Sequence, residues 1–465
     1  MSTSPYPGLR PFHRDEADIF FGRDEQVDQL LIRLGKSRFL AVVGPSGCGK
    51  SSLVHTGLLN ALEAGFLADV GLHWRVATMQ PGSHPMKNLA AALVKHIGPD
   101  TDILNTDKEC SFYPPLLSGD YTVDLSSAKP SPAGEGWVRG NQNVELDGLG
   151  TNINPLIESD ITSFSDTGPS TANEKPQHDD AAFLLATLRR GPLGLTEALR
   201  EQPLPENTNL LLVVDQFEEI FRYREHQDRD EADAFIALLL RSVQDSAFPV
   251  YIVITMRSDF LGDCALFPGL PEALNDSQFL TPRLNREQRR LAITGPARVC
   301  GGDVEPALVN RLLNDMGADP DQLPVLQHAL MRLWTEADKR GDKPVILKLN
   351  DYETMGGWDN TLSNHADEAF RELNDSQQAI AETVFRALTE RSGPRRDTRR
   401  PFSLQTVAGI AGADIEQVIS VIEVFRRADR SFVMPPVGQP LTAETLIDIS
   451  HESLIRQWQR MKVWV

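Results

Sequence analysis

Short runs of apolar residues predict the strands of a buried sheet. Residues 38–43 (RFLAVV), 209–214 (NLLLVV) and 249–254 (PVYIVI) are mainly apolar rather than alternating, which is typical of strands covered on both faces. A more mixed run at 74–79 predicts another strand of the same sheet. Apolar residues recur at helical spacing over residues 52–62. The pattern predicts an α/β core in which helices flank a parallel sheet.

Helical spacing dominates the second half of the chain. It predicts helices at residues 285–298, 325–334, 376–390, 402–411 and 414–425. Two short apolar runs near the end, residues 431–433 and 446–449, predict a pair of strands. A mainly helical region therefore follows the α/β core, and a mixed region closes the chain.

Length and composition narrow the class of protein. The chain has 465 residues, which suggests about three domains at roughly 150 residues each. With 46 basic and 65 acidic residues its net charge is −19, which argues against a nucleic-acid coat or a binder of anionic membranes. Four scattered cysteines lack the spacing of a zinc ribbon, and neither a signal peptide nor an 18-residue apolar stretch is visible. We expect a soluble, cytoplasmic, multidomain protein without a membrane partner.

More than half of the negative charge falls in one segment. Residues 99–180 contain 15 acidic and 4 basic residues, a local net of −11 that leaves −8 for the rest of the chain. The segment is rich in Ser, Pro and Gly and has no sustained periodicity, so we interpret it as an acidic, flexible insertion. A partner-binding or phosphorylated loop is the alternative, and the sequence does not reveal its role.

A complete phosphate-binding motif follows the first predicted strand. It matches GxxxxGK[ST] and consists, with the residue after it, of Gly44, Pro45, Ser46, Gly47, Cys48, Gly49, Lys50, Ser51 and Ser52. Glycines let backbone N–H groups surround a phosphate, and the following helix N-terminus adds partial positive charge. We expect Lys50 to reach the β- and γ-phosphates of a nucleotide and the Ser51 hydroxyl to bind Mg²⁺.

Acidic and basic residues at the ends of two later strands complete the predicted site. Asp215 ends one strand, where a carboxylate can hold Mg²⁺ at the ligand-binding edge of the sheet. Glu218 and Glu219 are both candidates to polarise the attacking water, and exposed positions at a helix start are an equal alternative for each. Arg257, at the end of the next strand, is a candidate to offset charge on a γ-phosphate. No guanine-recognition motif is present, which favours ATP over GTP.

These landmarks together resemble the STAND class of P-loop ATPases, and in particular the bacterial novel STAND group. Besides the phosphate-binding motif, the resemblance is carried by PYPGLRPF at 5–12, FFGR at 20–23, VDQFEE at 214–219, MRSDF at 256–260, LPVL at 323–326 and SHESLI at 450–455. It implies a nucleotide-binding P-loop domain (21–98 and 181–280) after an N-terminal segment (1–20), a helical domain (281–350) and linker helices with a winged-helix domain (351–465).

The resemblance also implies roles for four residues. Gly22 and Arg23 would lie near the adenine, Pro324 would pack against the base, and His451 would contact the β-phosphate of ADP and hold the inactive state. Taken alone, Pro324 is equally compatible with the first turn of a helix, and His451 with an ordinary satisfied polar group. The basic residues between Arg391 and Arg400 are interpreted as a solvent-facing loop rather than a DNA contact.

The expected function is an ATP-dependent signalling switch. Exchange of ADP for ATP would open the protein and expose an oligomerisation surface, and slow hydrolysis would reset it. The class implies bacterial signalling or defence against phage, with a sensor or effector not visible in this chain, which is either a fragment or works with a separate protein. The rivals are an AAA+-like DNA-binding initiator or transcriptional regulator and a nucleotide-gated scaffold without turnover.

Overall fold

The computed structural model describes residues 4–67, 70–71, 73–97, 177–317, 322–391 and 397–465. All of them belong to one compact unit of the chain. The predicted acidic insertion lies outside the described residues except for its last four positions. Those positions begin helix α5 (Gln177–Leu188). The helix is anchored through buried Leu184 and Leu188, and its first turn lies upstream of these apolar positions.

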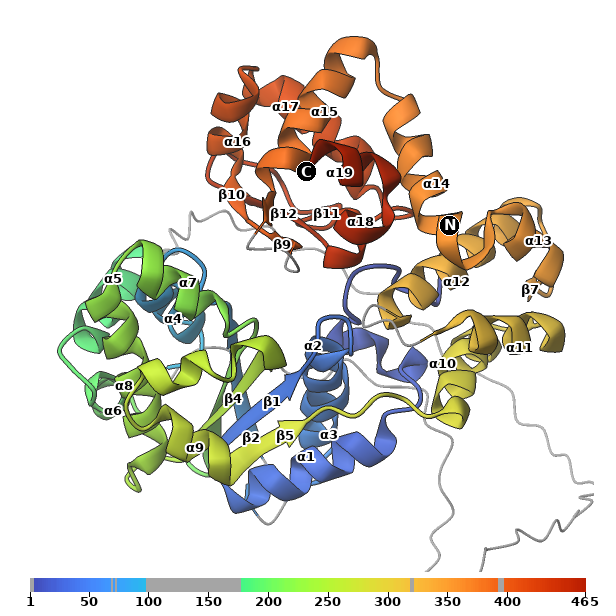
Figure 1. Ribbon diagram of the computed structural model, residues 1–465. Helices are drawn as coiled ribbons and strands as arrows, with labels where there is room; N and C mark the ends of the chain where they lie inside the picture. Colours follow the sequence, from blue (N-terminus) through green and yellow to red (C-terminus); the bar gives the residue numbers. More distant parts are fainter. Residues whose placement is uncertain (1–3, 68–69, 72, 98–176, 318–321, 392–396) are drawn as a thin grey trace, which may run out of the picture. The chain divides into compact units, whose positions relative to one another are not determined.

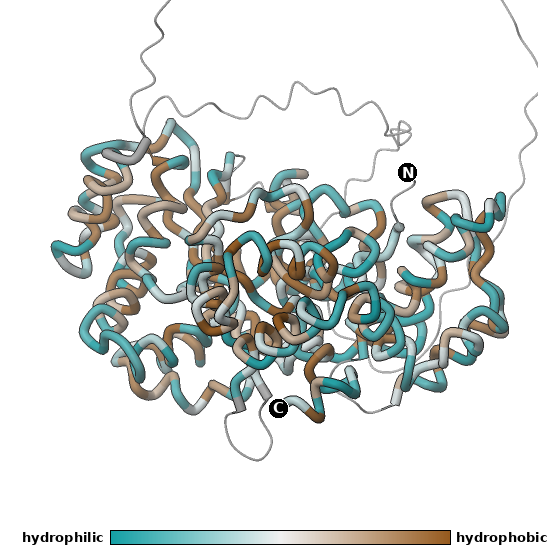
Figure 2. The backbone as a smooth tube through the Cα atoms, turned by 90° about the horizontal axis from the view of Figure 1, so that it is seen from above, coloured by the Kyte–Doolittle hydropathy of each residue, from teal (hydrophilic) through white to brown (hydrophobic). Residues whose placement is uncertain are grey.

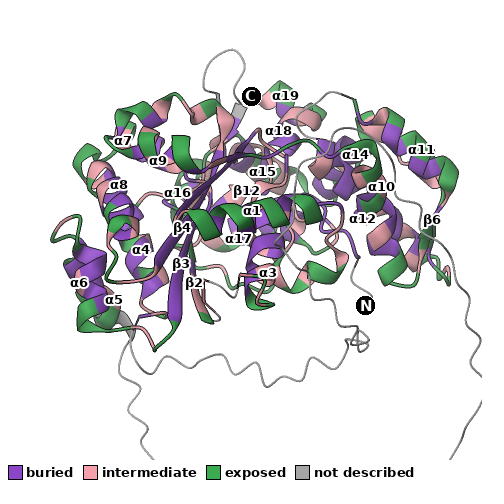
Figure 3. Ribbon diagram, turned by 90° about the horizontal axis from the view of Figure 1, so that it is seen from below, coloured by how far each residue is buried: buried purple, intermediate pink, exposed green. Residues whose placement is uncertain are grey.

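The first group of elements is built on a five-stranded parallel sheet with the order β2-β3-β4-β1-β5. Its strands are β1 (Phe39–Gly44), β2 (His73–Met79), β3 (Thr208–Val214), β4 (Val250–Arg257) and β5 (Gln278–Leu280). The four predicted strands are confirmed, and the short β5 is an addition that periodicity did not detect. Strands β3 and β4 are buried along almost their whole length (Figure 3), as continuous apolar runs require.

Helices cover both faces of this sheet (Figure 1). One face packs against α1 (Asp24–Lys36), a π-helical turn (Leu53–Leu58) and α3 (Leu59–Glu63). The other packs against α4 (Pro85–Leu93), α5, α6 (Gly194–Glu201), α7 (Glu219–His226), α8 (Arg229–Gln244) and α9 (Leu270–Ser277). Figure 2 shows hydrophobic and hydrophilic residues alternating along the coils of the helices.

The helix after the phosphate-binding motif is not regular. It starts as α2 (Lys50–Ser52), continues through the π-helical turn and ends as α3. Gly57 lies in the turn, where a Cβ atom would stand 2.6 Å from Val27 Cγ2 of α1. A π turn accommodates an extra residue without ending the helix, so 3.6-residue periodicity predicted the helix and missed its distortion.

A second group of elements shares a core around Trp334. It comprises α10 (Arg286–Val299), β6 (Asp303–Val304), α11 (Pro306–Asp315), α12 (Gln322–Lys339), β7 (Ile346–Leu347) and α13 (Leu349–Thr354). Asn285 caps α10, because its side chain accepts a hydrogen bond from Gln288 N and Gln288 Oε1 accepts one from Asn285 N.

The last group of elements packs around Trp458. Its helices are α14 (Gly357–Arg371), α15 (Asp375–Ala387), α16 (Leu404–Ala411), α17 (Ile415–Arg426), α18 (Glu452–Gln457) and α19 (Gln459–Trp464). Strands β10 (Phe402–Ser403), β12 (Leu446–Ile449) and β11 (Val433–Met434) form an antiparallel sheet in that order, and β8 (Thr389–Arg391) pairs with β9 (Asp397–Arg399). The predicted helix at 402–411 is therefore two residues shorter, since Phe402 and Ser403 pair with β12.

The N-terminal segment contacts all three groups. The Tyr6 hydroxyl donates to Ile293 O at 2.6 Å in the Trp334 core, and Leu9 is buried in the Trp458 core. Phe12 N donates to the Ser52 hydroxyl at 3.1 Å. No helix in the parts of the chain that the structure describes is both long and apolar enough to cross a lipid bilayer.

Candidate functional site

The phosphate-binding loop runs from Gly44, the last residue of β1, to Lys50, the first residue of α2. Gly47 and Gly49 have φ angles of 72° and 88°, which side-chain-bearing residues rarely adopt. At Gly44 a Cβ would stand 2.8 Å from Cys48 Sγ, so a larger residue there would require the Cys48 side chain to move. The glycines let the loop curl at a helix N-terminus, where an anion is stabilised.

Two loop-proximal side chains already have protein partners. Lys50 Nζ donates to the carbonyl oxygens of Gly44 and Pro45 at 3.1 and 3.0 Å, so its ammonium lies over the loop. Ser52 is buried, and its hydroxyl accepts from Phe12 N. The contact of Lys50 with the β- and γ-phosphates stays a prediction, and Ser52 is bound by the N-terminal segment.

Ser51 of α2 and Asp215, the residue after β3, bring a hydroxyl and a carboxylate together. The Ser51 hydroxyl donates to Asp215 Oδ1 at 2.8 Å, and the Thr255 hydroxyl donates to the same oxygen at 2.5 Å. Burial raises the pKa of Asp215, but His55 and these two hydroxyls outweigh it and lower the pKa to about 2. Asp215 is therefore an ionised carboxylate beside a hydroxyl, which is the donor set that Mg²⁺ prefers.

Ser51 and Asp215 can supply only part of the coordination shell of Mg²⁺. Among the described residues, no group of three or more His, Cys, Asp or Glu side chains gathers as a metal cluster. A P-loop metal is held in just this sparse way, since water and nucleotide phosphates supply the remaining oxygens.

The structure distinguishes the two candidate glutamates. Glu218 Oε2 accepts from Arg257 N at 3.3 Å, and Lys50 and Arg257 partly offset the rise in its pKa that burial causes. Glu219 Oε2 accepts from Gly82 N at 2.8 Å, and burial raises its pKa to about 7. Neither side chain is exposed, so the alternative of an exposed helix-start position is wrong for both. Glu218 is close enough to Lys50 and Arg257 for their charges to lower its pKa, and Glu219 is turned toward the loop at Gly82.

Arg257 ends β4 beside the phosphate-binding loop, as its pairing with Gly44 in the sheet requires. Its Nη2 lies 2.6 Å from Asp259 Oδ2 and its Nη1 lies 3.6 Å from Glu452 Oε1. The guanidinium that we expect to face a γ-phosphate is thus paired with two carboxylates in this conformation.

Glu452 is a site residue that the sequence did not reveal. Its Oε2 accepts from the Ser46 hydroxyl of the phosphate-binding loop at 2.9 Å, and its Oε1 lies 3.2 Å from Arg399 Nε. Burial raises its pKa, but Arg399, His451 and Arg257 outweigh this and hold the pKa well below its usual range. The only sequence signal was its place next to His451, which did not indicate these contacts.

His451 is the N-cap of α18. Its Nδ1 accepts from Ser453 N at 3.0 Å, so a neutral ring carries its proton on Nε2, which lies 3.8 Å from Glu452 Oε2. Pro324 is the third residue of α12, in the first turn that the alternative interpretation gave it. Contacts of His451 with a phosphate and of Pro324 with a base stay predictions.

Arg23 binds the phosphate-binding loop itself. Its guanidinium is buried and donates to the carbonyl oxygens of Cys48 and Pro282 at 2.7 and 2.8 Å, and burial lowers its pKa to about 10. Gly22 has a φ of 83°, and a Cβ there would stand 2.6 Å from Gln288 O. The segment therefore supports the loop from α1, and its contact with adenine stays a prediction.

The interpretation of residues 391–400 as a solvent-facing basic loop is wrong for Arg399. Its Nη1 donates to Asp448 Oδ2 at 2.7 Å, and Asp448 and Glu452 bind its side chain so that it is largely buried. Arg400 is exposed and lies over the Phe402 ring. Arg395 and Arg396 lie outside the described residues.

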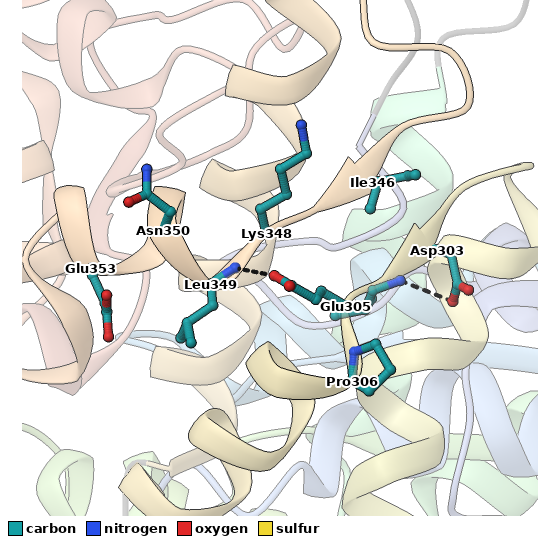
Figure 4. Close-up of a pocket in the computed structure, with 9 residues that line it drawn as sticks. Asp303, Glu305, Pro306, Ile346, Lys348, Leu349, Asn350 and Glu353 are labelled. Atoms are coloured by element: carbon teal, nitrogen blue, oxygen red, sulfur yellow. Dashed lines mark hydrogen bonds between the residues drawn. The ribbon is translucent and has the colours of Figure 1, made fainter.

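A cavity of about 610 Å³ lies away from this site, between β6, β7 and the start of α13 (Figure 4). In it, Glu305 Oε2 accepts from Leu349 N at 2.8 Å, so this carboxylate already caps α13. None of the lining residues is a predicted site residue.

A parallel sheet with a phosphate-binding loop after β1, and with a metal-type carboxylate after β3, defines a P-loop NTPase. The chain belongs to the Novel STAND NTPase 1 family, whose model matches residues 5–465. The resemblance to the novel STAND group is thereby confirmed, and with it a nucleotide-dependent NTPase.

Solved structures to which this chain shows similarity include an Aeropyrum pernix ORC2 protein in ADPNP-ADP complexes (12% identity, 95% of this chain and 93% of that chain covered, TM-score 0.40). They also include the Walker-type ATPase PABY2304 of Pyrococcus abyssi (11% identity, 96% of this chain and 98% of that chain covered, TM-score 0.37). A third is a mutant of Thermotoga maritima RuvB (11% identity, 97% of this chain and 99% of that chain covered, TM-score 0.33). Similarity this low does not transfer the ligands or activities of these proteins to this chain. No curated protein matches it in sequence.

Proposed function

We propose that this protein is an ATP/ADP-dependent switch with slow ATPase activity. Residues 21–98 and 181–280 would form the nucleotide-binding domain, residues 281–350 the helical domain, and residues 351–465 a closing domain. The order of α15, β10, α16, α17, β11 and β12, with an antiparallel sheet, supports a winged helix for the last of these. ADP in the P-loop would favour the closed form, and ATP would favour an open, oligomeric form.

The observation that carries the proposal is the contact of Glu452 with the phosphate site. Ser46 of the loop and Arg257 of β4 both bind this carboxylate, which belongs to the C-terminal group of elements. A nucleotide on the loop would therefore lie where the C-terminal elements close on the nucleotide-binding domain. His451 precedes Glu452 and would contact the β-phosphate of ADP.

A third phosphate changes the balance of charge at this contact. The γ-phosphate would place negative charge near Glu452 and attract Arg257 away from it. Both effects lower the affinity of the closed form for ATP relative to that of an open form. Such a difference in affinity between two states is what a ligand needs in order to shift them.

Hydrolysis would return the switch to the ADP form. Ser51 and Asp215 would hold Mg²⁺, which neutralises charge on the phosphates when it is bound. Glu218 would polarise the attacking water, since it faces Lys50 and Arg257, whereas Glu219 is held by Gly82. Turnover is expected to be slow, because Arg257 must first leave Asp259 and Glu452.

The partners proposed for this switch are further copies of the chain in the ATP state and a sensor or effector of bacterial signalling or antiphage defence. The test is the mass of the full chain in solution, measured by light scattering with ADP and with a non-hydrolysable ATP analogue. We expect a monomer with ADP and a larger assembly with the analogue. Lys50→Ala is the control and should bind neither nucleotide. The same mass under both conditions, with both nucleotides bound, would refute the switch.

A further inference from the structure

Arg399 connects the C-terminal elements to the strand that carries Asp215. Its Nη1 binds Asp448 and donates to Ile449 O at 3.0 Å, and its Nε lies 3.2 Å from Glu452. On the other side, its Nη2 donates to Gln216 Oε1 at 3.2 Å. A further contact runs through the backbone, since Arg222 Nη1 of α7 donates to Arg399 O at 2.9 Å. One guanidinium therefore bridges two carboxylates and the residue that follows Asp215.

Gln216 has an unusual backbone for its residue type. Its φ angle is 52°, in the left-handed region that residues with a Cβ seldom occupy. Its N–H donates to Thr255 Oγ1 at 3.1 Å, and the same hydroxyl donates to Asp215 Oδ1. A change in the position of Gln216 therefore reaches the Asp215 carboxylate through one shared hydroxyl. The side-chain contact with Arg399 helps to hold Gln216 in this conformation.

The charge of Arg399 is matched to its surroundings. Asp448, Glu452 and Glu219 are all acidic and lie in its vicinity, and burial raises the pKa of Asp448 while Arg399 lowers it. A planar guanidinium presents five N–H donors in a fixed fork, whereas an ammonium has three donors on one nitrogen and an amide has two. A lysine at position 399 would keep the positive charge but lose the forked N–H donors, and Gln216 Oε1 would lose its hydrogen bond from Nη2.

We propose that Arg399 is a positioning residue that couples closure of the C-terminal elements to the metal-binding strand. By holding Gln216, and through it Thr255, Arg399 fixes the Asp215 carboxylate next to Ser51. Mg²⁺-dependent nucleotide binding is then strongest when Asp448 and Glu452 are in place. The proposal rests on the proposed function in one respect, namely that nucleotide and Mg²⁺ bind at the P-loop.

The test measures the affinity of the full chain for a fluorescent ADP analogue with Mg²⁺ and with EDTA. The readout is the dissociation constant in EDTA divided by the dissociation constant with Mg²⁺. A larger ratio means a larger contribution of the metal to binding. In Arg399→Gln we expect this ratio to fall about 5- to 10-fold, with the EDTA value within about twofold of the native protein. Arg399→Lys, which keeps the charge and loses the fork, should lie between the two. The matched control is Arg400→Gln, which has the same change in charge on an exposed neighbour and should keep the native ratio.

A purely structural role would give a different result. Arg399→Gln would then lower the melting temperature and keep the native ratio below that temperature, which would overturn the proposal. If Arg399→Gln does not fold, Gln216→Ala removes the acceptor and leaves the ion pairs intact, and a native ratio in that variant would also overturn it. Where both variants fold, the double variant Arg399→Gln/Gln216→Ala should lower the ratio no further than Arg399→Gln alone. A fall equal to the product of the two single falls would mean that the residues act independently and would overturn the coupling. Failure of the native protein to bind ADP would instead refute the proposed function.

Discussion

We expect two buried histidines to make the stability of this protein sensitive to acid. His328 of α12 and His365 of α14 pack against each other and against Phe432, with His365 Nδ1 and His328 Nε2 3.3 Å apart. Burial, aided by the charge of Arg332, lowers the pKa of His328 to about 3. Burial also holds the pKa of His365 well below its usual value, with His328, Arg332, Arg430 and Lys339 adding to the effect.

The sign and size of the effect follow from the pKa of His328. Its unfolded pKa is 6.5, so below that pH the unfolded state binds a proton that the folded state excludes, and stability falls between about pH 6.5 and pH 3. At pH 5 the loss from His328 alone is about 2 kcal/mol, and it grows further as the pH falls toward 3. Exclusion of a proton from His365 as well would steepen this pH dependence.

The assay is urea unfolding of the native protein and of His328→Phe at pH 7.5 and pH 5.0. The variant removes the titrating ring and keeps an aromatic side chain next to Phe432. We expect the native protein to lose at least about 2 kcal/mol more than the variant between the two pH values. His226→Gln is the control, because the His226 side chain is 62% exposed. An equal loss in the native protein and His328→Phe would refute the reasoning.

Two further predictions concern the phosphate site. Arg23→Met removes the hydrogen bonds to Cys48 O and Pro282 O. The affinity for ADP, measured by fluorescence titration, should therefore fall at least about 10-fold. An unchanged affinity would contradict the role of Arg23 in supporting the phosphate-binding loop. Glu218→Gln should slow phosphate release about 10²-fold or more, and Glu219→Gln less than about 10-fold, because only Glu218 faces the phosphate cations. The reverse order would assign the water-polarising role to Glu219.

The sequence predicted those features whose cause is local. The phosphate-binding loop is specified by consecutive residues, since its glycines and the adjoining helix create the geometry without distant partners. The buried strands β1, β3 and β4 were predictable for the same reason, because an unbroken apolar run carries its own signal. Strand β5 has only three residues, and its existence depends on pairing with β1, which no local pattern encodes.

The contacts around Glu452 show why the rest of the site could not be predicted. Ser46 and Glu452 are 406 positions apart, and Arg399 and Gln216 are 183 apart. Neither pair has a spacing that a motif could record. Arg399 belongs to a basic cluster whose composition favours a solvent-facing loop, and only the fold brings Asp448 and Glu452 to it. Residue types thus predicted which chemistry is present, and tertiary structure decided which groups meet.

The same contacts limit how a nucleotide can act on the protein. A unit charge about 6 Å from Glu452 would cost about 2.8 kcal/mol at an effective dielectric constant of 20. A shift between two states from 1:99 to 99:1 needs about 5.5 kcal/mol, so repulsion of Glu452 alone does not suffice. Loss of the Arg257–Glu452 pair supplies a second contribution, because a γ-phosphate attracts the cation that now holds the carboxylate. A triphosphate would therefore act through both groups together, and a diphosphate, which lacks the third phosphate, would leave both contacts in place.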